Sequence, residues 1–593
     1  MPIVDTLVAV IPMLGLLIVV HELGHFLVAK ACGVRVLKFS IGFGAPIGFG
    51  NLRARWERGG TEYVIGWIPL GGFVRMLGEI MPGDDPEALG VPLDARPEES
   101  LDAKSVWQKL AVVFAGPAMN LLLPIVCLVG ILWVGFPRPA AVIGTVEANS
   151  PALAAGLEAG DRIVRLDGDD VAWWDEVILP LRERKAPGVA KIEIERAGAR
   201  RTLEVPLATQ KARDRFGAVV ETGWIGIGNR RQAALLGVPE AESLAVTAGL
   251  RSGDLVVRVG ETEIEDWEGL RTAHAKAVEA ARATGLAQVV WSVERPPAAI
   301  PLDVPAAADP QTPPLAPPPP PEAEKRRVVL PLESGLDALG LIPATILIGH
   351  VAPDKPAARA GLQANDLVLF VDGQPIGSFE SFVSFVQTSG GREFEITYSR
   401  EGRVGRVKLA AQEEVVPGLY EIEGMEEKVY QIGLGAALST LPGAVDKQQL
   451  RNPIESIPRA VEIAWGMTTE YLEGLGKLFT GEVGTDKLAG PIGIARIARK
   501  SLDQGWLDYL FMMMVISINL GFLNLLPIPI LDGGQAVLYS IEGIKRSPLS
   551  VRTREIATSV GFGLIVLLMG RAFWNDLTPF WLRFVDWLSS SSF

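Results

Sequence analysis

Residues 110–136 form an apolar segment without a single Asp, Glu, Lys, Arg or His, and this segment restricts the possible folds most strongly. A helix of about 20 apolar residues spans the hydrocarbon core of a bilayer. Three more segments are apolar enough for that role: residues 6–29, 510–531 and 556–570. The last segment is short, but it can span if Arg571 snorkels and if Trp574 and Trp581 lie at the headgroups. The sequence therefore predicts a polytopic α-helical membrane protein with about four transmembrane helices.

The first apolar segment has an alternative interpretation as a cleaved signal peptide. A signal peptide begins with basic residues, whereas no Lys or Arg precedes Lys30. The segment also carries His21, Glu22 and His25, which are costly in lipid and serve no purpose in a disposable leader. These residues favour a retained transmembrane helix.

The distribution of basic residues predicts the orientation in the membrane. Ten Lys and Arg residues lie between the first two spans, and four lie between the last two: Lys545, Arg546, Arg552 and Arg554. By the positive-inside rule both loops are cytoplasmic. The long stretch from about residue 137 to residue 508 then faces the other side, which is the periplasm in a host with two membranes.

Composition excludes several classes of protein. The chain has 593 residues, enough for about four folded units, so it is neither a miniprotein stapled by disulfides nor a disordered chain. Its net charge of −13 argues against binding to nucleic acid. The two cysteines, Cys32 and Cys127, lie in or beside apolar segments and do not identify a redox compartment.

One pattern occurs three times between the second and third spans. Each copy has a short helical turn, an Ala-Gly-Leu sequence, an Asp and an alternating strand, over residues 150–168, 248–260 and 356–373. Each copy should close with a β-hairpin, which pairs residues 191–196 with 201–207, 289–295 with 326–332, and 393–400 with 406–410. The loop of the second hairpin is rich in Pro and Ala, so we expect an extended or disordered insertion there; a Pro-rich ligand for another protein is the alternative.

The repeated pattern resembles the circularly permuted PDZ domains of bacterial proteases. PDZ domains capture peptide ends by strand addition. The resemblance implies carboxylate-binding turns at residues 226–228 in unit two and at residues 339–342 in unit three. Equally, the units could act as steric filters that bind no peptide tightly.

His21-Glu22-Leu23-Gly24-His25 is an HExxH sequence. Positions i and i+4 of a helix share one face, so both imidazoles can face one ion while Glu22 holds and deprotonates a water molecule. Each ionisable residue in the middle of a membrane helix costs on the order of 2.5–3.5 kcal/mol. Three such residues together favour a metal site over a structural explanation.

A catalytic zinc generally needs a third protein ligand. The two other histidines, His274 and His350, fall in the repeats on the far side, so a carboxylate at membrane depth is required. Asp532 terminates the third apolar segment, after Pro527 and Pro529 and before a Gly pair. Prolines break a helix and glycines allow a sharp turn. The alternative is an Asp that caps a helix at a junction.

The two motifs together, HExxH in the first span and NxxPxPxLDGG in the third, resemble the site-2 proteases, which are intramembrane zinc metalloproteases. The resemblance implies that His21, His25 and Asp532 bind one Zn²⁺ ion and that Glu22 is the catalytic base. It also implies that Asn524 and Asn519 engage the substrate backbone, with an interhelical hydrogen bond as the alternative for each. Residues 114–120 resemble the FAGPxxN motif of the family, in which small residues permit close helix packing.

Residues 34–76 alternate in the manner of strands, and in the family this segment forms a β-loop that dips into the membrane beside the site. Its edge at Gly71, Gly72 and Phe73 could pair with an unwound substrate, whereas the plainer alternative is a cytosolic surface sheet. Before the third span, apolar residues recur at helical spacing: Val461, Ala464, Trp465, Leu472, Leu475 and Phe479. They predict an amphipathic helix on the outer membrane surface or over the site entrance, or else an ordinary core helix.

These observations give a domain plan: transmembrane helix 1 (1–30), β-loop (31–104), transmembrane helix 2 (105–137), three tandem PDZ-like α/β units on the periplasmic side (138–210, 215–335 with a Pro-rich insertion at 296–325, and 336–412), amphipathic region (413–505), transmembrane helix 3 with LDGG (506–535) and transmembrane helix 4 (553–576). It departs from the familiar family pattern in having three PDZ-like units instead of two and Gln535 where members often have His.

The resemblance implies regulated intramembrane proteolysis in the cell inner membrane, with the catalytic site toward the cytoplasm. The implied substrates are single-span membrane proteins already trimmed by an upstream site-1-type protease, such as anti-sigma factors and remnant signal peptides. Membrane lipid and peptide ligands of the PDZ-like units complete the expected partners. The competing hypothesis is a non-catalytic membrane scaffold that gathers periplasmic peptides; Glu22 speaks against it, because a scaffold needs no base.

Overall fold

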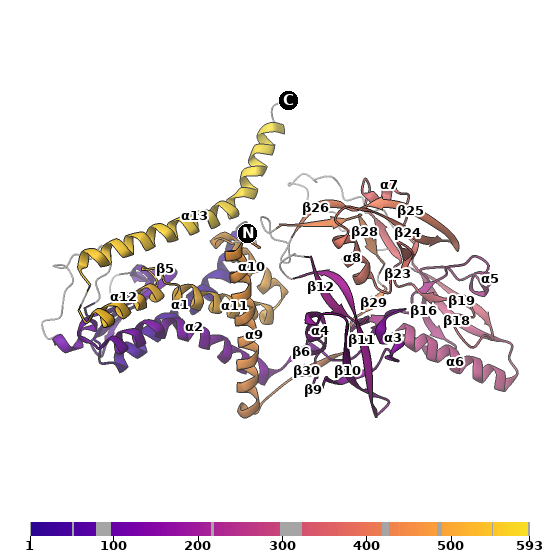
Figure 1. Ribbon diagram of the computed structural model, residues 1–593, viewed down its shortest axis with the longest axis horizontal. Helices are drawn as coiled ribbons and strands as arrows, with labels where there is room; N and C mark the ends of the chain where they lie inside the picture. Colours follow the sequence, from indigo (N-terminus) through magenta and orange to yellow (C-terminus); the bar gives the residue numbers. More distant parts are fainter. Residues whose placement is uncertain are drawn as a thin grey trace. The chain divides into compact units, whose positions relative to one another are not determined.

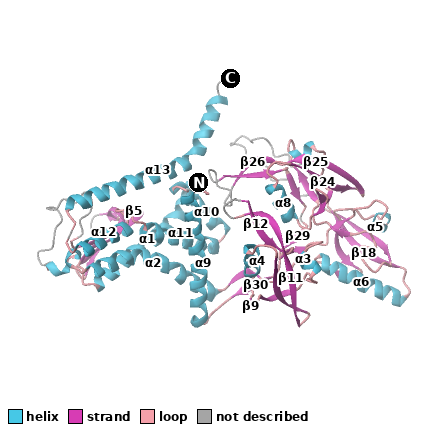
Figure 2. Cartoon of the chain, in the orientation of Figure 1, coloured by secondary structure: helices cyan, strands magenta, loops and turns pink. Residues whose placement is uncertain are grey.

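The computed structural model describes residues 2–49, 52–78, 96–214, 219–296, 323–417, 426–437, 439–482, 489–547 and 549–590. Most of the predicted Pro-rich insertion, residues 297–322, lies outside the described residues. The chain divides into two compact units. The membrane unit comprises residues 1–136, 417–427 and 448–593, and the repeat unit comprises residues 137–416 and 428–447. Helices dominate the first unit and strands the second (Figure 2).

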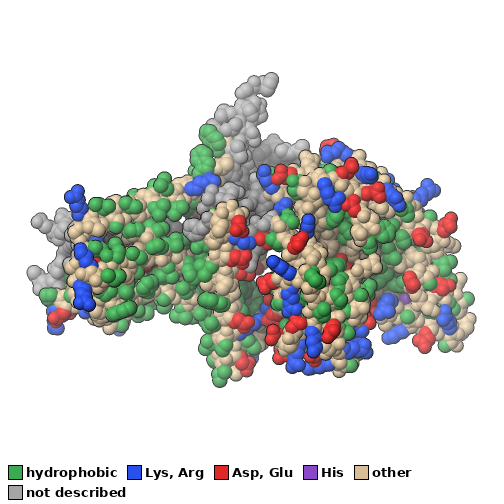
Figure 3. Space-filling view, viewed as in Figure 1, with side chains coloured by type: hydrophobic (Ala, Val, Ile, Leu, Met, Phe, Trp, Pro, Cys, Tyr) green, Lys and Arg blue, Asp and Glu red, His purple; other side chains and the backbone are tan. Residues whose placement is uncertain are grey.

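The membrane unit is built on long apolar helices (Figure 1). Its helices are α1 (Pro2–Ala31), α2 (Val106–Val134), α9 (Pro453–Thr480), α10 (Pro491–Gln504), α11 (Trp506–Leu525), α12 (Asp532–Lys545) and α13 (Val551–Ser590). Four segments are long and apolar enough to cross a membrane: Val4–Ala31, Val106–Val134, Trp506–Leu525 and Arg552–Thr578. Their number agrees with the prediction. Hydrophobic side chains cover much of the surface over these helices (Figure 3).

The predicted end of the third span is wrong. The apolar segment was expected to reach residue 531, and the domain plan extended the helix through LDGG to residue 535, but α11 ends at Leu525 and Asp532 opens a separate helix, α12. Pro527 and Pro529 have no N–H to donate, so the helical hydrogen-bond ladder stops before them. The fourth span is longer than residues 556–570, because α13 continues through Arg571.

A β-sheet follows α1 in the membrane unit. Its strands are β1 (Val36–Pro46), β4 (Arg55–Arg58) and β5 (Thr61–Met76), with a short hairpin of β2 (Gly48–Phe49) and β3 (Leu52–Arg53). The long strand β5 doubles back, because Ser40 of β1 pairs with both Val64 and Phe73 of β5. The strands expected in residues 34–76 are therefore present. Apolar residues of β1 and β5 pack with Ala29 of α1 and Val112 of α2, which anchors the sheet to both helices.

The repeat unit holds three copies of one arrangement. Repeat one has β7 (Thr145–Val146), α3 (Pro151–Ala154), β8 (Arg162–Leu166), β9 (Asp169–Asp170), α4 (Trp174–Glu183), β10 (Gly188–Arg196), β11 (Ala199–Arg213), β12 (Val219–Trp224) and β13 (Ile227–Gly228). Repeat two has β15 (Leu236–Gly237), α5 (Leu244–Thr247), β16 (Leu255–Val259), β17 (Thr262–Glu263), α6 (Trp267–Thr284), β18 (Gln288–Arg295), β19 (Glu324–Pro331) and β20 (Ile342–Pro343). Repeat three has β21 (Ile348–Val351), α7 (Pro356–Arg359), β22 (Leu367–Val371), β23 (Gln374–Pro375), α8 (Phe379–Thr388), β24 (Glu393–Arg400), β25 (Arg403–Ala410) and β28 (Leu434–Ala436).

The remaining short strands pair with one another, β6 with β30, β14 with β29 and β26 with β27. Their bounds are β6 (Phe136–Pro139), β14 (Arg231–Gln232), β26 (Gln412–Pro417), β27 (Glu426–Gln431), β29 (Thr440–Leu441) and β30 (Val445–Gln448). Each repeat has its own cluster of buried apolar side chains. The three predicted hairpins are confirmed, because β10 pairs with β11, β18 with β19, and β24 with β25, all antiparallel.

The predicted boundaries of the repeats are wrong at their C-terminal ends. Each repeat is completed by a strand that follows the hairpin and returns to the first strand: Ile227 pairs with Val146, Ile342 with Gly237, and Leu434 with Val351. The turn at residues 226–228 therefore belongs to repeat one, and the turn at residues 339–342 belongs to repeat two. The closing strands are only two or three residues long, so they leave almost no periodic signal in the sequence.

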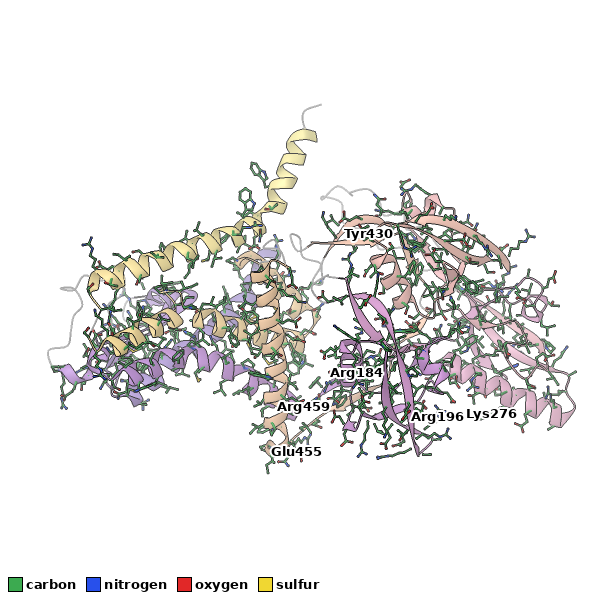
Figure 4. The ribbon with its side chains drawn as sticks, in the orientation of Figure 1. Arg184, Arg196, Lys276, Tyr430, Glu455 and Arg459 are labelled. Carbon is green, nitrogen blue, oxygen red and sulfur yellow. The ribbon has the colours of Figure 1, made fainter. Side chains whose placement is uncertain are left out.

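The same buried ion pair recurs in every repeat. Asp161 pairs with Arg196, Asp254 with Arg295, and Asp366 with Arg400, with Nε–Oδ1 distances of 2.6, 2.6 and 2.7 Å. The three carboxylates are 1% exposed or less. Arg196, at the end of β10, is labelled in Figure 4. A buried carboxylate is stable only when it is paired, so each arginine ties the turn before one strand to the end of the hairpin.

Helix α9 contains the apolar residues that were predicted to form an amphipathic stripe. Ala464 is buried with Ala460 against Leu128 and Leu132 of α2, but Val461, Trp465 and Leu472 are exposed. The side chain of Phe479 is outside the described set. Three residues of the predicted stripe are thus exposed and one, Ala464, is buried, which argues against an ordinary core helix whose buried face is formed by the stripe.

Candidate metal centre

Helices α1 and α2 cross at very close range where the HExxH sequence lies. A Cβ added to Gly24 would lie 2.3 Å from the carbonyl oxygen of Ala115. A Cβ added to Gly116 would lie 2.3 Å from Nε2 of His25. Real Cβ atoms do not approach other atoms so closely, so glycine is required at both positions. The close crossing seats the two imidazoles against the backbone of α2.

Three side chains converge on one point at this crossing. The Nε2 atoms of His21 and His25 lie 3.2 Å apart. Oδ2 of Asp532 lies 3.2 Å from Nε2 of His21 and 3.6 Å from Nε2 of His25. Both histidines are 8% exposed, and the side chain of Asp532 is 22% exposed. The three predicted metal ligands therefore lie together, with one partly open side.

The turn between α11 and α12 brings Asp532 to the histidines. The N–H of Leu531 donates to the carbonyl oxygen of Ile528, which closes the turn. A Cβ on Gly533 would lie 2.1 Å from the carbonyl oxygen of Leu525, and a Cβ on Gly534 would lie 2.1 Å from that of Ile528. Both glycines of LDGG are needed for this compact turn. Asp532 is the first residue of α12 and not its N-cap, which is Leu531, so the alternative of a capping Asp at this junction is not supported.

The three donor atoms fit a zinc ion. Zn–N and Zn–O bonds of about 2.0–2.1 Å in a tetrahedron place neighbouring donor atoms roughly 3.3–3.4 Å apart. The three measured separations of 3.2, 3.2 and 3.6 Å lie close to that value. Two imidazole nitrogens with one carboxylate oxygen is a donor set of catalytic zinc sites, which keep a fourth position open.

The second nitrogen of each imidazole also has a partner. Nδ1 of His25 lies 2.8 Å from the carbonyl oxygen of Val112, to which it donates. Nδ1 of His21 lies 3.2 Å from the side-chain amide of Asn120. Partners of this kind fix the orientation of metal-ligating histidines. Sequence reasoning did not assign these roles to Val112 or Asn120, whereas the motif over residues 114–120 did indicate the close packing that Gly116 allows. A signal for Asn120 was available, since it is a polar residue inside an otherwise apolar span.

Glu22 lies between the metal ligands and the sheet. Its carboxylate accepts a hydrogen bond from the backbone of Val74 in β5. A Cβ on Gly72 would lie 3.3 Å from Cγ of Glu22 and 2.8 Å from the carbonyl oxygen of Ser40, so glycine lets β5 approach Glu22. Gly71 has a φ of +150°, which other residues rarely adopt. The ring of Phe73 stacks on Phe43, with 6.3 Å between centroids.

The two asparagines of α11 differ in their surroundings. Nδ2 of Asn524 lies 3.5 Å from Nε2 of His21, so this side chain borders the metal ligands. Oδ1 of Asn519 accepts a hydrogen bond of 2.8 Å from the hydroxyl of Tyr471 in α9. That bond corresponds to the interhelical alternative for Asn519. Gln535 donates to the carbonyl oxygen of Pro529 at 3.3 Å and thus supports the turn before Asp532.

Comparison with known proteins covers nearly the whole chain. The model of peptidase family M50 matches residues 9–568. The regulator of sigma-E protease RseP of Escherichia coli (strain K12) is 29% identical over 565 residues, which are 95% of this chain and 96% of that protein. Protease RseP of Yersinia pestis is 29% identical over 582 residues, which are 98% of this chain and 99% of that protein. A predicted zinc metalloprotease of Xylella fastidiosa (strain 9a5c) is 29% identical over 564 residues, which are 95% of this chain and 96% of that protein.

Proposed function

The chain belongs to peptidase family M50, the site-2 proteases, and we propose that it carries out regulated intramembrane proteolysis of single-span membrane proteins whose outer part has already been removed. It is a membrane protein and a zinc metalloprotease of the site-2 type. The observation that carries the proposal is the meeting of His21, His25 and Asp532, which come from opposite ends of the chain. We assign these three residues as the ligands of one zinc ion.

The chemistry follows from the arrangement of the side chains. Zinc supplies Lewis acidity to such a site, where it polarises a peptide carbonyl and makes water more acidic. Glu22 is one residue from a ligand and is partly exposed, so its carboxylate can take a proton from the attacking water. The hydroxyl group adds to the carbonyl carbon, the C–N bond breaks, and Glu22 gives the proton to the departing nitrogen.

The edge of β5 offers a way to present a substrate. A helical substrate pairs its own amides internally, so it must unwind before its peptide bonds can be cut. Among the described residues, no strand pairs with the edge of residues 72–76 that faces α1. An extended substrate segment added at Gly71, Gly72 and Phe73 would pass beside Glu22. Asn524, next to His21, is placed to donate to a substrate carbonyl, and we keep Asn519 as a weaker candidate.

We assign the three repeats as PDZ-like units on the periplasmic side of the inner membrane, where they filter or bind the trimmed end of the substrate. The permuted topology supports this assignment, because each repeat is closed by a strand that follows its hairpin. The turns at residues 226–228 and 339–342 remain candidate carboxylate-binding turns, now in repeats one and two. RseP is named a regulator of sigma-E protease, so anti-sigma factors are the substrate class to test first.

Replacement of the base tests the proposal. Glu22→Gln keeps the shape of the side chain but cannot accept the proton from water. We expect the purified variant in detergent to hold one zinc per chain and to leave a pre-trimmed single-span reporter uncut. Glu555→Gln, at an exposed position of α13, is the matched control and should cleave normally.

Three outcomes would contradict the proposal. Cleavage by Glu22→Gln at the wild-type rate would remove Glu22 from the mechanism. Retention of zinc by both His21→Ala and Asp532→Asn would show that the ligands lie elsewhere. A wild-type protein that binds periplasmic peptides but cuts no membrane reporter would favour the scaffold hypothesis.

A further inference from the structure

Asn120 is a fully buried polar residue inside the second membrane-spanning helix. Its side chain is 0% exposed. Its Nδ2 atom lies 3.2 Å from Nδ1 of His21, and its Oδ1 atom has no hydrogen-bond partner among the described residues. An unpaired buried amide oxygen costs free energy, so the orientation of this amide needs a reason.

The reason lies in the tautomer of His21. If Nδ2 of Asn120 donates to Nδ1 of His21, then Nε2 of His21 must carry the ring proton in the neutral imidazole. A proton on Nε2 would occupy the lone pair that faces Asp532 and His25. The opposite amide orientation places Oδ1 against Nδ1, which then holds the proton and leaves Nε2 free. The oxygen and nitrogen of an Asn amide have nearly the same size and shape, so the hydrogen-bond network decides between the two orientations.

The main chain of Asn120 is held by a second contact. In a regular helix the carbonyl of residue 120 accepts the N–H of residue 124, but residue 124 is proline. The hydroxyl of Ser517 in α11 fills that position, with 2.7 Å from Oγ to the carbonyl oxygen of Asn120. Ser517 is itself fully buried. Pro124 thus leaves the carbonyl of Asn120 without its helical donor, and the Ser517 hydroxyl of α11 donates to that carbonyl instead. This contact holds the main chain of Asn120 beside His21.

We propose that Asn120 is a positioning residue for the metal centre: its Oδ1 accepts the Nδ1 proton of His21 and so presents Nε2 to zinc, while Ser517 fixes Asn120. The proposal rests on the assignment of His21 as a ligand. Carbonyl and carboxylate partners of metal-bound histidines typically change metal affinity by roughly 10- to 100-fold. Asn120 would play that part for His21, as the carbonyl of Val112 does for His25.

The experiment measures zinc affinity directly, by chelator competition with the purified full-length protein in detergent. We expect Asn120→Ala to weaken zinc binding by roughly 10- to 100-fold. Asn120→Asp keeps an acceptor oxygen of the same shape and should bind zinc at least as tightly as wild type. Tyr509→Phe is the matched control, because it removes another interhelical hydrogen bond, 2.6 Å from the Tyr509 hydroxyl to the carbonyl oxygen of Ala9, far along α1 from His21.

The comparison between variants separates positioning from stability. If Asn120 had only a structural role, Asn120→Ala would behave like Tyr509→Phe: it would lower the thermal stability of the zinc-free protein and leave the zinc affinity unchanged. That result for Asn120→Ala would overturn the proposal. Equal weakening by Asn120→Ala and Asn120→Asp would also overturn it. His21→Ala separates the role of Asn120 from the ligand assignment. If His21→Ala loses zinc but Asn120→Ala binds it with normal affinity, only the positioning role of Asn120 is refuted. If His21→Ala retains zinc, the assignment of the ligands is refuted.

Discussion

Loss of Arg295 should open the hairpin of repeat two. The guanidinium of Arg295 donates to both carboxylate oxygens of Asp254, with distances of 2.6 and 2.8 Å. Within the described part of the chain the carboxylate has one further partner, the N–H of Arg251 at 3.0 Å, and Asp254 is 0% exposed. Arg295→Met removes the positive charge and leaves a buried carboxylate with a single hydrogen bond. Breaking a buried pair in this way costs about 3–5 kcal/mol.

Hydrogen exchange on the full-length protein in detergent measures this cost locally. The reporters are the amides of β18, which pairs with β16 through Leu255–Glu294 and Val256–Val293. A loss of about 3–5 kcal/mol in the free energy of opening accelerates their exchange by roughly 10²- to 10⁴-fold, since each 1.4 kcal/mol is a factor of ten.

Arg258→Met is the matched control for that experiment. Arg258 lies in the same sheet but pairs with Glu261, whose side chain is 99% exposed. Exposed pairs contribute about 0–1 kcal/mol, so exchange should change less than about sixfold. If Arg295→Met leaves the exchange of β18 within a factor of ten of wild type, the reasoning about the buried pair is refuted.

Three other predictions follow from the contacts described above. Gly116→Ala places a Cβ 2.3 Å from Nε2 of His25 and should abolish zinc retention, whereas Gly130→Ala in the same helix meets nothing within 4 Å and should keep it; zinc content of the purified variants decides. Removal of zinc by a chelator should lower the midpoint of thermal unfolding in wild type but not in Asp532→Asn, and equal shifts would contradict the ligand assignment. In repeat three the N–H of Glu395 and the guanidinium of Arg392 hold the pKa of Asp372 below its ordinary value. Its stabilising contribution is therefore present above about pH 4 and lost as the pH falls further. Asp372→Asn should flatten the dependence of local unfolding on pH below about pH 4; an unchanged slope in hydrogen exchange of β24 would refute the assignment.

The sequence could indicate the three side chains that meet at the proposed metal site, because polar residues are conspicuous in apolar segments. His21, Glu22 and His25 interrupt an apolar segment, and Asp532 follows another, so few alternative ligands existed. The contribution of Asn120 depends on where α2 crosses α1, and no spacing along one helix contains that information. Proline and glycine in residues 527–534 signalled a turn, but not that α11 stops at Leu525.

The hairpins of the repeats could be predicted because their strands are long and alternate in polarity. The closing strands could not, because Ile227–Gly228 and Ile342–Pro343 are too short to show any period. Their pairing is set by the tertiary fold, which returns a distant segment to the first strand of each repeat. That is why the turns at residues 226–228 and 339–342 were assigned to the following units.

Because Asp532 follows His25 by 507 residues, the three proposed ligands come together only late in biosynthesis. A ribosome that adds about 5–20 residues per second needs roughly 25 to 100 s to make that intervening stretch. A nascent or truncated chain already contains Glu22, the proposed base, but lacks Asp532, the proposed third ligand. If Asp532 is required to hold zinc, the enzyme would be inactive while its own apolar helices enter the bilayer, and it would become able to cut membrane segments only after nearly all of them have been inserted.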